Sequence, residues 1–161
     1  MRLTNAIPAA ALILFLGASG VHAHGGPTPN SGEKSFGRPG LAKDVTRTFA
    51  IEASEYAFGP DAIAIQAGET VKFVVTNKGR LMHELTIGDA AEQDAHSRAM
   101  DKMSDMKHDD EKKEMPSNAV HVPPGETREL IWTFAKGGDL KFACNYPGHT
   151  DLGMKGDIVV K

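Results

Sequence analysis

The sequence holds a single cysteine, Cys144, so the chain cannot form an internal disulfide. It has no run of ~18 or more uncharged apolar residues, which argues against a membrane-spanning helix. The formal net charge is −3 over 161 residues, so neither a nucleic acid nor an anionic membrane is indicated as a partner. It also lacks a Ser-His-Asp constellation, a paired-carboxylate motif, a phosphate loop and a nucleotide fingerprint. These absences argue against a hydrolase or a dehydrogenase.

Residues 1–23 have the order of a secretory signal peptide. One basic residue, Arg2, precedes a short apolar run at 9–16, and small residues then lead to an expected cleavage after Ala23. An uncleaved anchor is the alternative. Cleavage would leave about 138 residues, one ordinary domain, as an exported, soluble, periplasmic protein without membrane insertion. A free thiol in an oxidising compartment is a liability unless something occupies it.

Residues 24–44 are rich in Gly, Pro and Ser and are predicted to form a flexible N-terminal arm. Alternating apolar residues bounded by turn residues then predict short strands. These strands are expected at 45–53, 62–66, 70–77, 81–87, 118–122, 127–134, 139–144 and 156–160. Such spacing is typical of an all-β sandwich of seven to eight strands, which would occupy residues 45–161.

The loop "CNYPGHTDLGM" gathers three side chains that share an affinity for soft metals. Cys144, His149 and Met154 are each separated from the next by four residues. Cys144 ends the apolar face of the strand at 139–144, so its thiol is expected to point into the sandwich. A buried, inert cysteine is the alternative, but its neighbours argue against that interpretation.

A tight metal site needs one more nitrogen, and His83 is the best candidate. It follows a turn, lies on the apolar face of its strand and comes from a different part of the sandwich. Two imidazoles, one thiolate and a weak thioether suit copper that cycles between its two oxidation states. Zinc would accept the first three donors but gains little from a thioether. The pattern therefore predicts one copper ion per chain as cofactor.

The segment "FACNYPGHTDLGMKGDIVV", with "GETVKFVVTNKGRLMHELTIG" upstream, resembles the cupredoxins, the plastocyanin and azurin family of blue copper proteins. The resemblance covers residues 45–161 apart from one insertion, and it implies a Greek-key sandwich with a type 1 copper site. It also implies that His83, Cys144 and His149 are the equatorial ligands and Met154 the axial one. Family members often have Asn directly after the first histidine, where it ties the two ligand loops together. This chain has Glu84 there, which leaves the support of the thiolate open.

Residues 89–115 break the strand pattern, because helix formers dominate and Gly, Val, Ile and Thr are absent. We expect a helical insertion before the last three strands. A helical stripe would carry His96, Met100 and Met103, with Met106 at its margin. This stripe either binds a second, weaker copper as Cu(I) or packs the helix against the sandwich. Similar insertions occur in bacterial periplasmic cupredoxins linked to copper tolerance, which this chain resembles most closely.

Two further histidines, His24 and His121, lie outside this set of ligands. If cleavage follows Ala23, His24 begins the mature chain, and its free amine and imidazole could chelate one Cu(II). A disordered arm without a role is the favoured alternative, because Gly25 and Gly26 supply no rigidity. His121 lies in a strand before two prolines and is expected to be a packing or surface residue, not a ligand.

The implied function is one-electron transfer by a periplasmic blue copper protein that is not an enzyme, with a redox partner that the sequence does not identify. The alternative is a copper-tolerance protein that sequesters or oxidises periplasmic Cu(I). A copper oxidoreductase such as a nitrite reductase ranks lowest, because it normally needs a second copper and usually a second cupredoxin domain.

Overall fold

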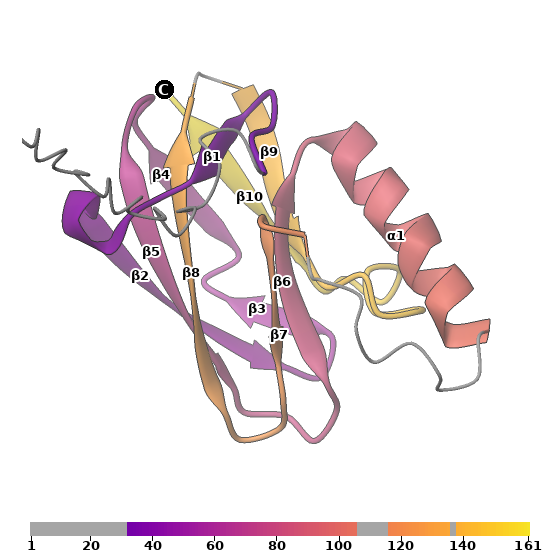
Figure 1. The fold of residues 1–161 in the computed structure, drawn as a ribbon. Helices are drawn as coiled ribbons and strands as arrows, with labels where there is room; N and C mark the ends of the chain where they lie inside the picture. Colours follow the sequence, from indigo (N-terminus) through magenta and orange to yellow (C-terminus); the bar gives the residue numbers. More distant parts are fainter. Residues whose placement is uncertain (1–31, 106–115, 136–137) are drawn as a thin grey trace, which may run out of the picture.

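A computed structural model describes residues 32–105, 116–135 and 138–161. Two five-stranded sheets pack face to face, and one helix lies against the outside of the second sheet (Figure 1). The strands are β1 (Gly37–Pro39), β2 (Arg47–Ser54), β3 (Ala57–Gly59), β4 (Ala62–Ile65), β5 (Thr70–Asn77), β6 (His83–Gly88), β7 (Ala119–Val122), β8 (Thr127–Phe134), β9 (Gly138–Ala143) and β10 (Lys155–Val160). The helices are the 3-10 turn η1 (Ala42–Asp44) and α1 (Ala90–Asp105).

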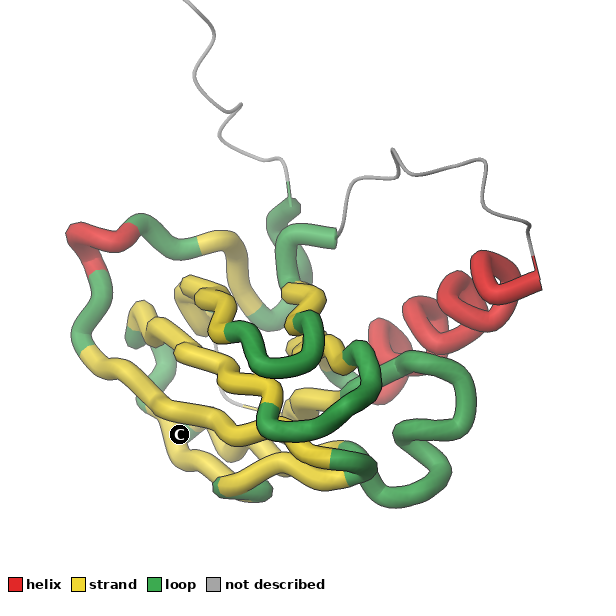
Figure 2. Tube along the Cα trace, turned by 90° about the horizontal axis from the view of Figure 1, so that it is seen from below, coloured by secondary structure: helices red, strands yellow, loops and turns green. Residues whose placement is uncertain are grey.

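The chain crosses between the two sheets, which together form a Greek-key sandwich. The first sheet has the order β1-β8-β5-β2-β3 and the second the order β4-β10-β9-β6-β7. Two pairs are parallel, β2 with β5 and β4 with β10, and the other named pairs are antiparallel. Seen from below, α1 lies to one side of the layered strands (Figure 2).

The strand alternation predicted from the sequence places apolar side chains between the sheets. Phe73 on β5 and Trp132 and Phe134 on β8 are fully buried there, and Phe142 reaches them from the opposite sheet. Burying such side chains is the main favourable contribution to folding, at roughly 25 cal/mol per Å² of apolar surface. The core holds the second sheet in place, and that sheet carries the candidate site described below.

The all-β sandwich is confirmed, but it has ten strands where seven to eight were predicted. The extra strands, β1 and β3, have three residues each, too few to show an alternating pattern. β1 lies inside the segment predicted to be a flexible arm. It pairs with β8, and the preceding Phe36 is buried with its ring 5.6 Å from that of Trp132, so the arm interpretation is wrong for this part.

The insertion is helical from Ala90 to Asp105, and residues 106–115 lie outside the described part. Asp89 caps the helix, since its Oδ1 accepts the backbone N–H of Glu92 at 2.9 Å. Four strands, β7 to β10, follow the helix. They match the four strands expected at 118–122, 127–134, 139–144 and 156–160, so the placement of the insertion before the last three strands is wrong by one strand.

β6 is buried along its whole length, an unusual pattern for a strand of an antiparallel sheet. One face of β6 points into the core, and α1 covers the other. Gln93 of α1 donates through Nε2 to the carbonyl of Thr86 on β6 at 2.8 Å and to that of Lys141 on β9 at 3.2 Å. The helix therefore closes off the outer face of the two strands that lead to the site.

Candidate metal centre

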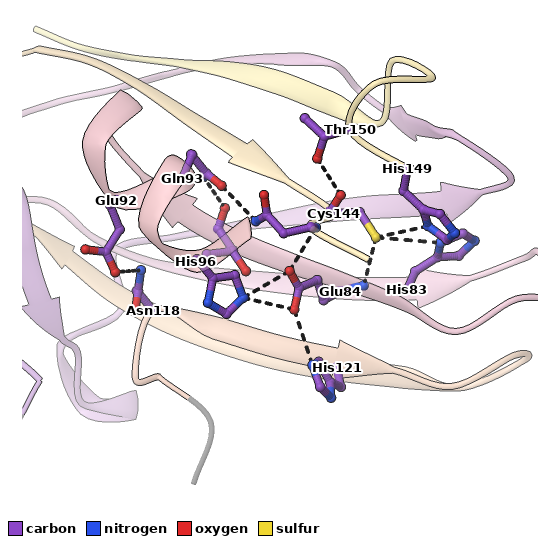
Figure 3. Close-up of polar contacts among 12 residues, drawn as sticks. His83, Glu84, Glu92, Gln93, His96, Asn118, His121, Cys144, His149 and Thr150 are labelled. Atoms are coloured by element: carbon purple, nitrogen blue, oxygen red, sulfur yellow. Dashed lines mark hydrogen bonds and ion pairs between the residues drawn. The ribbon is translucent and has the colours of Figure 1, made fainter. Parts of the chain in front are cut away.

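Three potential metal ligands meet at one end of the second sheet (Figure 3). The thiol of Cys144 lies 3.3 Å from Nδ1 of His149 and 3.9 Å from Nδ1 of His83. All three ligand atoms lie within 4.8 Å of one another. The structure thus brings together the three side chains that the sequence indicated as the nitrogen and sulfur ligands.

The strand pairing explains this convergence. His83 begins β6, and Cys144 directly follows β9, its antiparallel neighbour, in the register Thr86↔Ala143. The start of one strand therefore lies beside the end of the other. His149 lies in the loop that connects β9 to β10. Gly148 has φ +82° in that loop, a left-handed conformation that favours glycine.

Backbone hydrogen bonds place Met154 at the same loop. Its N–H donates to the carbonyl of His149 at 3.0 Å, and its carbonyl accepts the N–H of Cys144 at 3.0 Å. The Thr150 hydroxyl also donates to the carbonyl of Cys144, at 2.6 Å. The side chain of Met154 is fully buried. Backbone hydrogen bonds within the loop therefore hold Cys144, His149 and Met154 in place, and His83 lies beside them at the start of β6.

Burial sets the ionisation of the metal-free site. Desolvation raises the pKa of the Cys144 thiol to about 11, although backbone N–H groups of Glu84 and Tyr146 lower it in part. Burial also lowers the pKa of His83 and of His149, so both imidazoles are neutral at pH 7. A metal that binds here must displace the thiol proton, whereas the imidazoles are ready as neutral donors.

Two tyrosines flank the exposed edge of the site. Tyr56 meets the ring of His149 edge-on at 5.3 Å between centroids, and the ring of Tyr146 lies 5.9 Å from it. Cys144 and His83 are fully buried, whereas His149 is half-buried and forms the edge nearest to solvent. No sequence pattern indicates a role for Tyr56, which comes from the turn between β2 and β3.

Glu84 supports the site from the outer face of β6, which the sequence did not predict. Its own backbone N–H points at the Cys144 sulfur at 3.5 Å, while its Oε1 accepts the N–H of Asn145 at 2.9 Å. Burial raises the pKa of Glu84, but contacts from His121, His96 and the Asn145 N–H outweigh it and lower the pKa to about 2. The carboxylate is therefore ionised and ties together the two segments that carry His83 and Cys144.

The donor set fits copper. One thiol and two neutral imidazoles converge, a buried thioether residue is adjacent, and these are soft and borderline ligands. His83 Nε2 has no hydrogen-bond partner in the described part of the chain, and Nδ1 is the nitrogen that faces Cys144. When bound, copper would supply one-electron chemistry between Cu(II) and Cu(I).

Residues 45–161 match the family described as copper binding proteins, plastocyanin/azurin family. The chain belongs to this family. The cupredoxin resemblance seen in the sequence is thereby confirmed, and copper binding is the activity common to the match and to the site.

Two relatives of this cupredoxin are bacterial proteins described as "Copper-resistant cuproprotein CopI". The one from Rubrivivax gelatinosus is 40% identical over 89% of this chain and 80% of its own length. The one from Pseudomonas aeruginosa is 36% identical over 80% of this chain and 83% of its own length. The likeness to cupredoxins linked to copper tolerance is thus confirmed.

A solved structure of auracyanin B is similar in fold, with a TM-score of 0.63 at 20% identity. The match covers 78% of this chain and 96% of that structure. In the described part of this cupredoxin, no helix is long and apolar enough to cross a membrane.

The other predicted sites are placed only in part. His96 and Met100 are buried on α1, and His96 contacts the carboxylate of Glu84. This contact favours the packing interpretation of the methionine stripe. The side chains of Met103 and Met106, and the whole of residue His24, lie outside the described part, so copper binding there stays a prediction. His121 contacts Glu84 at 3.2 Å and lies outside the three-ligand cluster.

Proposed function

We propose that this cupredoxin is a periplasmic copper-tolerance protein with a type 1 copper site. His83, Cys144 and His149 would bind the metal, with Met154 as the axial ligand. The observation that carries the proposal is the buried His-Cys-His cluster within a chain 40% identical to a copper-resistant cuproprotein. The leader at 1–23 supports export to the compartment where copper first enters a bacterial cell.

The site chemistry suits a protein that must hold copper in either oxidation state. Imidazoles and a thiolate bind Cu(II), and the thiolate with the thioether also suits Cu(I). Because backbone hydrogen bonds order the ligand loop, the donors are arranged before the metal arrives. A buried site also keeps the metal away from other thiols of the compartment.

Copper tolerance can be tested by growth. Expressed with its leader in a copper-sensitive bacterium, the wild-type chain should raise the copper concentration that halves growth by about twofold or more. The Cys144→Ser variant should give no gain, because the thiolate is the strongest ligand of the set. Immunoblots of the periplasmic fraction control for equal export. A gain that survives the substitution would contradict tolerance through this site.

Electron transfer is the second candidate, and the arrangement of the ligands favours it. Two ligands are fully buried and positioned at strand ends, so copper would change its surroundings little between oxidation states. The half-buried His149 would give electrons a short route to a partner. A chain that cycles reversibly by one electron but gives no growth advantage under copper would support a carrier role over tolerance.

The insertion can be tested as a second copper site by changing Met100, Met103 and Met106 together to Leu, which keeps the side-chain volume. We expect the visible band and the Cu(I) stoichiometry to be unchanged, because Met100 is buried and His96 is held by Glu84. Anaerobic titration against a Cu(I) chelator measures the stoichiometry. Loss of Cu(I) equivalents with an intact band would instead place additional copper on the insertion.

A further inference from the structure

One imidazole of the insertion contacts the buried carboxylate beside the metal centre (Figure 3). Nε2 of His96, on α1, lies 3.1 Å from Oε1 and 3.2 Å from Oε2 of Glu84. Both side chains are shielded from solvent, with exposed fractions of 8% for His96 and 0% for Glu84. A hydrogen bond shielded from water is electrostatically stronger than one in water, and loss of His96 would leave Glu84 with His121 and the Asn145 N–H as its remaining partners.

The direction of this hydrogen bond follows from the carboxylate. Both oxygens of Glu84 lie within hydrogen-bond distance of the same ring nitrogen, and a carboxylate can only accept, so this contact places the hydrogen on Nε2 of His96. The same carboxylate accepts the backbone N–H of Asn145 at 2.9 Å. One carboxylate therefore holds a residue of the helix and the residue that directly follows the thiol ligand.

The contacts of the Glu84 carboxylate with His96 and with the Asn145 N–H are called the Glu84 bridge here, and the register of the sheet explains its position. β6 and β9 pair antiparallel with Thr86 opposite Ala143, and continuing that register by two residues places Glu84 opposite Asn145. Beyond the end of β9, the side chain of Glu84 thus accepts the Asn145 N–H, where a backbone carbonyl would accept it within the sheet. Its backbone N–H, at 3.5 Å from the sulfur of Cys144, depends on the same alignment.

A second contact from the helix acts on the same ligand segment. Nδ2 of Asn145 donates to Oε1 of Gln93 at 2.9 Å, while Nε2 of Gln93 donates to Thr86 of β6. Gln93 and His96 lie three residues apart, on one face of α1. The backbone N–H of Asn145 is bound through Glu84 and its side chain through Gln93, so both contacts lead back to the helix.

We propose that His96 is a positioning residue for the metal centre: through the Glu84 carboxylate, the inserted helix fixes Asn145 and keeps the Glu84 N–H on the Cys144 thiolate. This inference rests on the proposed copper site. It assigns to the helix a role at the primary site, separate from any copper that its methionines bind.

The test compares three variants at the helix. His96→Leu removes the donor, His96→Gln restores an N–H of similar reach, and Glu92→Ala is the matched control. Glu92 anchors the same helix through Asn118 at 3.2 Å and Lys34 at 2.8 Å, and these contacts are separate from the Glu84 bridge. Each variant is measured without copper by amide hydrogen exchange at Asn145, and with Cu(II) by its visible spectrum and its dissociation rate into a chelator.

In His96→Leu we expect hydrogen exchange at Asn145 to accelerate about tenfold or more and copper dissociation to accelerate about tenfold, since supporting groups typically change metal affinity by 10–100-fold. The thiolate-to-copper band should shift as well. His96→Gln should return all three readouts to near wild type, and Glu92→Ala should leave them unchanged. The double variant Glu84→Leu/His96→Leu removes the buried charge together with its partner and should dissociate copper as fast as His96→Leu. If His96→Leu fails to fold, the double variant supplies the comparison.

Several results would overturn the inference. Unchanged exchange and dissociation in both leucine variants would show that the bridge does not position the site. Equal effects in Glu92→Ala would attribute the changes to general docking of the helix. A wild-type protein that binds copper without the visible band would overturn the proposed type 1 site, whereas altered exchange at Asn145 in that case would still support the bridge within the metal-free protein.

Discussion

Replacing Cys144 with serine will abolish the intense visible absorption of the copper-loaded protein. That absorption arises from charge transfer between the thiolate and Cu(II), and the hydroxyl of serine cannot supply it. Cys144 is fully buried and clusters with two imidazoles. It is the only cysteine of the sequence, so no other thiol of the chain can take its place. We expect the absorbance per bound copper to fall more than tenfold, measured on samples of equal copper content.

Met154→Leu is the matched control for this prediction. It keeps a buried side chain of similar volume at the other end of the ligand loop and removes only the thioether, which would be the weakest donor of the proposed set. The visible band should therefore persist in Met154→Leu. A wild-type protein that is colourless at full copper occupancy would rule out a type 1 site at these residues.

The second large effect is expected at Glu84, in the metal-free protein. Its pKa is about 2 in the folded chain and 4.5 for the ordinary side chain, a difference that corresponds to about 3 kcal/mol of folding stability. Because the folded pKa is the lower one, this stability is present above pH 4.5. It is lost as the pH falls from 4.5 toward 2.

Glu84→Gln isolates this contribution from the other acidic groups. At pH 7 the variant should unfold with a free energy about 3 kcal/mol below that of the wild type, and the gap should close as the pH approaches 2. Denaturant unfolding at pH 7, 5 and 3 measures the difference. A gap that is constant with pH would mean that folding does not lower the pKa of the Glu84 carboxyl.

Local patterns were enough to predict most of the fold. Alternation of apolar residues located the eight longer strands, and helix formers after Asp89 located α1. The two shortest strands were missed, because pairing and not pattern defines them. β1 exists through its bonds to β8 and the burial of Phe36 against Trp132, neither of which is visible in a three-residue segment.

The candidate metal ligands were recognisable because such a combination of side chains is rare in one loop, but the residues that support them were not. Glu84 looked like a departure from the family pattern, because Asn often follows the first histidine in family members. A charged residue in a strand also normally faces solvent. Its burial depends on α1, which begins directly after β6 and folds back over it, and on His121, which lies opposite Glu84 in β7. Such cover from other elements cannot be deduced from strand periodicity.

The position of β10 also bears on the order in which the chain can assemble. β10 pairs in parallel with β4, about ninety residues earlier in the chain, and antiparallel with β9. Contacts so distant in sequence make folding slow, because a long loop must close before they form. A nascent chain that has emerged as far as Met154 already carries the four predicted primary ligands, yet β4 has no neighbour and the loop has no second strand to anchor it. Closure of the second sheet beside Cys144 therefore depends on β10 docking between β4 and β9.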